Sequence, residues 1–143
     1  MPVVGMNIKN INAKKNEEAV GTVRVNSDTN LKEMREQDLP ALKTKGLAIE
    51  FEFKTEYTNE KKEKIAEITV GGDVLFIDEK YERILKGWKK DKKLPDDIDV
   101  EIINAILRKN IVRALTLSDE LQLPAPVAIP FVRKKQQDSS YIG

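Results

Sequence analysis

The chain has 143 residues, the length of one ordinary domain, and contains neither cysteine nor histidine. These absences exclude disulfides, thiolate nucleophiles, the usual zinc sites and any catalysis that depends on a histidine base. The 25 basic and 24 acidic residues leave a net charge of +1, so the chain as a whole offers no strong field for nucleic acid or an anionic membrane.

The rest of the composition predicts a folded cytoplasmic protein. Apolar residues make up 40% of the chain, which is enough for a core. No apolar stretch approaches the length of a membrane span, and the start, Met1–Met6, lacks the features of a secretory signal. We expect one domain over residues 1–132, followed by a flexible polar tail over 133–143.

The first half of the chain is predicted to form strands. Apolar and polar residues alternate from Leu47 to Tyr57, a period of two that is typical of a half-buried strand. After a polar turn, a second strand is expected over residues 64–77, broken or bulged at Gly71-Gly72. Together these two segments predict a long antiparallel hairpin.

Two shorter strands are expected before this hairpin. The first covers Met6–Ile11, with a bulge or strand end after Ile8, and the second covers Ala19–Asn26. The segment Ser27–Gly46 is too long for a plain turn, and Pro40 interrupts it. We expect this segment to cross the sheet, with one helical turn at residues 30–37.

The second half of the chain is predicted to be helical. Asp78 is a good N-cap for a short helix in which Tyr81, Ile84, Leu85 and Trp88 form one apolar stripe. The predicted fold is therefore α+β, a four-stranded antiparallel sheet with a long crossover, followed by a short and a long helix that pack on the sheet and at an oligomer interface.

The long helix, expected at Asp97–Leu117, has apolar residues around most of its circumference. A small sheet and one short helix cannot cover such a helix, so we expect a second copy of the chain to cover part of it. The alternative is a thick single-chain core. The residues predicted at the oligomer interface are Ile102, Ile103, Ile106 and Ile111.

Charged clusters give weak signals for a site. Asp96, Asp97 and Asp99 stand where a helix favours negative charge, which explains them better than a metal site does. The lysines around Trp88 are better read as a solvated loop beside a core residue than as a nucleic-acid site.

Two sets of strand residues are left open between a structural and a binding role. Glu50, Glu52 and Glu56 share one strand face, which is either a solvated surface or a binding surface for a cation or a basic partner. Phe51, Phe53, Tyr57 and Phe76 are either core, which the pattern favours, or part of an exposed groove for extended peptides.

Three segments resemble the SecB family of protein-export chaperones. The opening strand 6–11 is similar to the family's first strand, residues 66–77 to its fourth strand with Gly-Gly, and Leu121–Val127 to its Leu-x-Leu-x-Pro-Val segment after the long helix. The similarity covers residues 6–128. The family's C-terminal amphipathic helix has no counterpart after Val127, so a contribution of that helix to docking the SecA motor is not carried over.

The resemblance implies a homotetramer that binds non-native polypeptides without ATP and without a cofactor. By family position, the client groove involves the crossover and the aromatic strand residues: Leu31, Met34, Leu39, Leu42, Phe51, Phe53, Tyr57 and Phe76. The acidic strand face, Glu50, Glu52 and Glu56, resembles in placement the family surface that contacts the translocation machinery. These transfers are regional, not residue by residue.

We therefore expect a non-enzymatic chaperone that holds unfolded polypeptides, and the resemblance implies a role in protein export. The alternative is an α+β oligomeric subunit that binds one specific protein partner, such as a toxin or antitoxin. An enzyme that uses carboxylates on a hard metal is the least supported hypothesis. We expect no nucleic-acid partner and no membrane insertion.

Overall fold

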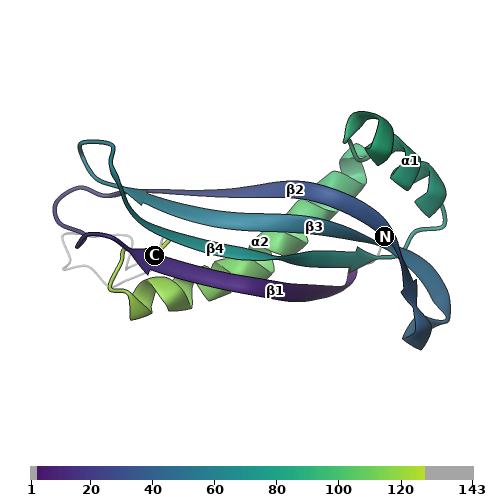
Figure 1. Ribbon diagram of the computed structural model, residues 1–143, viewed down its shortest axis with the longest axis horizontal. Coiled ribbons are helices and arrows are strands. Elements are labelled where there is room, and N and C mark those ends of the chain that lie inside the picture. Colours follow the sequence, from purple (N-terminus) through teal and green to yellow (C-terminus); the bar gives the residue numbers. More distant parts are fainter. Residues whose placement is uncertain (1–2, 128–143) are drawn as a thin grey trace, which may run out of the picture.

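The segment with alternating residues forms the centre of a four-stranded antiparallel sheet (Figure 1). The computed structural model describes residues 3–127, so the tail predicted at 133–143 lies outside the described residues. The strands are β1 (Val3–Lys15), β2 (Arg24–Leu39), β3 (Thr44–Thr58) and β4 (Lys64–Phe76), in the spatial order β1-β4-β3-β2. The predicted β3–β4 hairpin is therefore confirmed.

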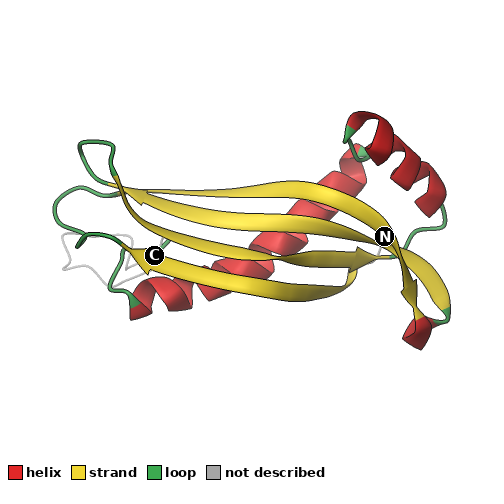
Figure 2. Ribbon diagram, in the orientation of Figure 1, coloured by secondary structure: helices red, strands yellow, loops and turns green. Residues whose placement is uncertain are grey.

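Both helices follow the sheet in sequence (Figure 2). Helix α1 (Tyr81–Asp91) lies at one end of the sheet, and helix α2 (Asp96–Glu120) crosses one face diagonally. The buried residues of α2 recur at every fourth position, which makes one narrow stripe along the helix. They are Ile98, Ile102, Ile106, Asn110, Ala114 and Ser118. The predicted α+β class, with four antiparallel strands and two helices on the sheet, is confirmed.

The crossover and helical turn expected within Ser27–Gly46 are wrong. Strand β2 occupies most of this segment and pairs with β3 along its length, and the two strands are joined by η1, a one-turn 3-10 helix at Pro40–Leu42. A register shift between Leu31 and Met34 interrupts the alternation of β2, so its sequence does not show a simple period of two. The connection that does cross the sheet is residues 16–23, which links the two edge strands.

The centre of β4 passes close to the bulged part of β1. The register between these strands shifts between Ile8 and Asn10, which confirms the bulge predicted after Ile8. Gly71 and Gly72 lie opposite this bulge, and β4 continues through them without a break. A Cβ on Gly72 would collide with the backbone carbonyl oxygen of Asn7, so the bulge leaves room only for glycine at this position.

We expect Gly72→Ala to lower the free energy of unfolding by about 1–3 kcal/mol, because β1 would have to move away from β4. Urea unfolding can measure this change through the fluorescence of Trp88, the only tryptophan in the chain. Gly87→Ala is the matched control, since the nearest neighbour of a Cβ there, the carbonyl oxygen of Lys93, is 3.9 Å away and the residue lies inside α1. The control should gain up to about 1 kcal/mol from helix propensity. A Gly72→Ala variant as stable as the parent would contradict the close approach of the two strands.

Candidate functional site

With no histidine or cysteine in the chain, acidic side chains are the main ligands left for a metal ion. No group of Asp and Glu side chains within residues 3–127 is arranged to hold a metal ion. Asp96, Asp97 and Asp99 lie in the first turn of α2, where their charge favours the helix. In the same part of the chain, neither helix is long and apolar enough to span a membrane.

The four aromatic residues of the predicted client groove lie in the core. Phe51, Phe53, Tyr57 and Phe76 are at most 1% exposed, which is the role the sequence pattern favoured. Burial raises the pKa of Tyr57, so its hydroxyl stays protonated and donates a hydrogen bond to the carbonyl oxygen of Pro124 at 2.8 Å. This bond ties the segment after α2 to the sheet.

The other four predicted groove residues lie along β2 and η1. Leu31 pairs with Phe51, and Met34 pairs with Ile49 and is buried. Leu39 is half-buried at the end of β2, whereas Leu42 in η1 is 51% exposed. The structure therefore joins Leu31 and Met34 to the aromatic core and places Leu42 at the projecting tip of the β2–β3 hairpin (Figure 2).

A second apolar stripe runs along α2 beside the buried one. It consists of residues spaced by three or four positions, none of them buried, and we call it the outer stripe: Val100, Ile103, Leu107, Ile111 and Leu115. Val100 is 58% exposed. Of the four residues predicted at an oligomer interface, Ile102 and Ile106 are fully buried in the core of their own chain, and Ile103 and Ile111 belong to the outer stripe.

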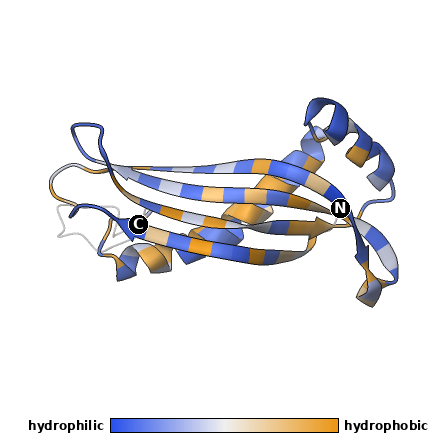
Figure 3. Ribbon diagram, viewed as in Figure 1, coloured by the Kyte–Doolittle hydropathy of each residue, from blue (hydrophilic) through white to orange (hydrophobic). Residues whose placement is uncertain are grey.

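Hydrophobic and hydrophilic residues alternate along the strands (Figure 3), and the residues of β3 between its buried ones are mostly charged, so the sheet face opposite α2 is polar. Glu50, Glu52 and Glu56 alternate along β3 and are half-buried there. Lysines share this surface, with Lys32 Nζ 3.5 Å and Lys54 Nζ 4.0 Å from carboxylate oxygens of Glu52. The predicted acidic face is thus one continuous surface whose negative charge is partly neutralised.

Asp73 in β4 is a buried carboxylate that sequence reasoning missed. Its Oδ2 lies 2.8 Å from Nη2 of Arg35 on β2 and 3.0 Å from Nζ of Lys9 on β1. The hydrogen bonds from Arg35 are the main cause that holds the pKa of Asp73 below its ordinary value, and Lys9 adds to the effect. Asp73 therefore links both edge strands to the centre of the sheet. The available signal was a carboxylate directly after Gly71-Gly72, within the otherwise apolar second half of β4 at residues 70–76.

We expect Asp73→Asn to lower the free energy of unfolding by about 1–3 kcal/mol, because both cations lose their ionic partner. The wild-type carboxylate contributes stability that is fully present above the ordinary Asp pKa of 3.8. That contribution is lost as the pH falls through the lowered pKa of the folded state. Between neutral and acidic pH, the free energy of unfolding should therefore fall more steeply for the parent protein than for the variant.

Glu36→Gln is the control for this measurement. Glu36 pairs with Lys45 at 3.4 Å through exposed side chains, so its loss should cost less than about 1 kcal/mol. Equal costs for the two variants would contradict the role assigned to Asp73.

One solved structure has a similar fold over nearly the whole chain. It is a SecB-like chaperone of Mycobacterium tuberculosis in complex with a ChAD peptide from the HigA1 antitoxin, with a TM-score of 0.56 and 10% sequence identity. The alignment covers 94% of this chain and 92% of the other. No protein-family model matches the chain, and no curated protein matches its sequence. The chain thus has a SecB-like fold.

Proposed function

We propose that the protein is an ATP-independent chaperone that binds non-native polypeptides in the cytoplasm. The observation that carries this proposal is the SecB-like fold, since the similar chaperone was solved with a bound peptide. The apolar residues left outside the core support it, because binding of unfolded chains depends on burial of apolar side chains. The proposed activity requires no catalytic group and no cofactor.

The client surface that we propose lies along β2 and η1. Leu31, Leu39 and Leu42 supply its accessible apolar area, and Leu42 is the most exposed of the three. The remaining residues of the proposed groove are buried beneath this surface, and clients would reach them only if the elements packed over them moved. They are Met34, Phe51, Phe53, Tyr57 and Phe76. Burying one leucine side chain contributes about 1.5–3 kcal/mol, so a few contacts suffice for weak and general binding.

We propose that the outer stripe of α2 is covered by a second copy of the chain. Ile103 and Ile111 are the two residues of the predicted interface that remain available for this contact. A dimer or tetramer would remove the apolar side chains of this stripe from water and place several client surfaces on one particle.

The polar face carrying Glu50, Glu52 and Glu56 is free for a different partner. Its carboxylates suit a basic docking segment, and by family position we propose that this segment belongs to the translocation machinery. This partner would bind on the sheet face opposite α2, so it need not compete with clients.

A second candidate function is recognition of one specific protein. The similar chaperone was solved with a peptide from an antitoxin, which supports an adaptor that serves a single partner. A pull-down dominated by one protein, without protection of unrelated clients, would favour this candidate over a general chaperone.

We expect the protein to suppress aggregation of a chemically denatured client at a stoichiometric ratio. Leu42→Asp should weaken client binding about tenfold or more, because a charge replaces the exposed leucine of the proposed surface. Light scattering during dilution of the client from denaturant measures the effect. Val20→Asp is the control, since Val20 is 78% exposed but lies in the β1–β2 connection. Absence of protection, or equal loss in both variants, would contradict the proposed surface.

We expect Ile103→Asp to convert the oligomer to monomers while leaving the secondary structure unchanged, because a carboxylate would be buried without a partner at the interface. Sedimentation velocity measures the mass, and circular dichroism checks the fold. Lys109→Asp tests the opposite side of α2 from Ile111, where Lys109 is exposed, and should leave the mass unchanged. A parent protein that sediments as a monomer would contradict this interface.

A further inference from the structure

Positive charge is concentrated in one short segment of this nearly neutral chain. Residues 80–93 contain seven Lys or Arg side chains and two carboxylates. On the sheet, cations form ion pairs with carboxylates of the same chain, as Lys9, Arg35 and Lys64 do. In contrast, Arg83, Lys86 and Lys89 form no ion pair with any residue in the range 3–127. These three cations are therefore available to a partner.

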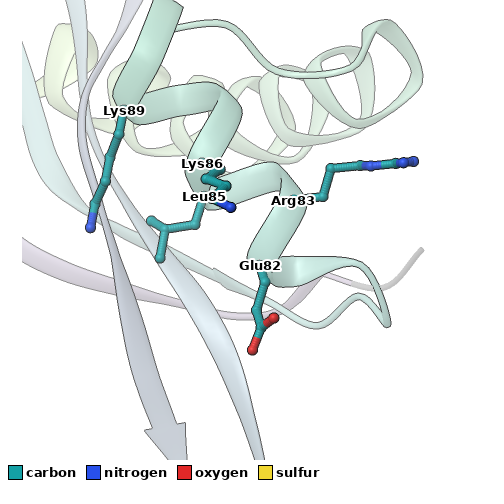
Figure 4. Close-up of a pocket in the computed structure, with 5 residues that line it drawn as sticks. All are labelled: Glu82, Arg83, Leu85, Lys86 and Lys89. Carbon is teal, nitrogen blue, oxygen red and sulfur yellow. The ribbon is translucent and has the colours of Figure 1, made fainter.

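Figure 4 shows that Leu85 and Lys89 project from one side of α1, whereas Arg83 projects from the opposite side. A groove of about 500 Å³ is lined by Glu82, Arg83, Leu85, Lys86 and Lys89. Leu85 is half-buried in the middle, Lys89 lies towards one end, and Glu82 lies at the other end. The opposite side of α1 is anchored by Ile84 and Trp88, both buried in the core. The buried side of α1 thus holds the helix in place, while its outer side presents cations to solvent.

Several like charges lie close together along α1. Lys86 lies three residues from both Arg83 and Lys89 and four residues from Lys90, spacings at which like charges on a helix repel one another. Gly87 further weakens α1, although no neighbour crowds that position. A negatively charged partner would relieve the repulsion.

We propose that this face of α1, which we call the cationic groove, binds acidic polypeptide segments in which an apolar side chain lies between carboxylates. The apolar side chain would contact Leu85, and the carboxylates would pair with Lys86 and Lys89. This inference goes beyond the proposed chaperone activity, because the groove lies on a different element from the β2–η1 client surface and can be tested without a client.

The chemistry of the groove favours a peptide over nucleic acid. Single-stranded nucleic acid binds most tightly where exposed aromatic rings stack on bases. Trp88 is only 5% exposed, and the groove is lined by a leucine with no aromatic side chain. A carboxylate also stands within it, at Glu82, which is unfavourable for a continuous phosphate backbone.

The test uses the full chain and a fluorescently labelled peptide of about a dozen residues, mostly Glu with two Leu, at low salt (about 0.05 M). Anisotropy should report binding, and the emission of Trp88 beneath the groove should change with the same titration curve. Lys86→Glu/Lys89→Glu should raise Kd about tenfold or more. Lys86→Gln/Lys89→Gln should raise it less, and this variant keeps the helix free of new charges.

Lys61→Glu/Lys62→Glu is the matched control. It makes the same change of charge in the β3–β4 turn, at the other end of the molecule (Figure 1), and should leave Kd unchanged apart from a small general effect of net charge. A peptide with Gln in place of Glu should bind at least about tenfold more weakly than the acidic peptide.

Three results would overturn the proposal. They are no binding of the acidic peptide at low salt, equal weakening by the groove and control variants, and tighter binding of a single-stranded oligonucleotide of equal charge. Circular dichroism of every variant separates loss of the groove from loss of the fold. The aggregation test depends on the β2–η1 surface and a denatured client, so failure of the peptide assay would leave that test of the proposed function unaffected.

Discussion

Helix α2 lies across one face of the sheet, and its contact with that face determines which surfaces of the protein remain open. The stripe from Ile98 to Ser118 covers the aromatic side chains of β3 and β4, which are thereby removed from water. Because α2 is also apolar on its neighbouring side, the outer stripe is only partly buried within the chain. The core of one chain and the proposed contact with a second copy are therefore two sides of one helix. Helix α2 does not cover the β2–η1 tip or the cationic groove.

The second constraint is the way in which the edge strands are held to the centre of the sheet. Both edge strands carry an irregularity in register, next to Lys9 in β1 and close to Arg35 in β2. Those two cations converge on Asp73, which lies between them on β4. The bulges let the edges adjust in register, and the shared carboxylate fixes them there. This arrangement leaves the face opposite α2 polar and available to a partner.

Much of the fold follows from the sequence because its strongest patterns are local. The alternation in β3 and the apolar stripe of α1 each depend on near neighbours in the chain, and both patterns lie in the elements that the sequence predicts. The predicted N-cap is wrong, because α1 begins at Tyr81 with Lys80, not Asp78, at the N-cap position. Strand β2 was misread because its bulge breaks the alternation and because an edge strand buries little of its surface. Asp73 was missed because its partners lie on strands distant in sequence. The aromatic residues could be assigned to the core, but the sequence does not reveal that α2 lies across them.

The central claim is that apolar surfaces outside the core serve self-association and the binding of unfolded chains. Static light scattering of the protein, alone and mixed with a reduced and alkylated polypeptide that cannot fold, tests both parts in one measurement. The account predicts a mass that is a multiple of 16.3 kDa and that increases when the polypeptide is added. A particle of 16.3 kDa whose mass is unaffected by the polypeptide would contradict it.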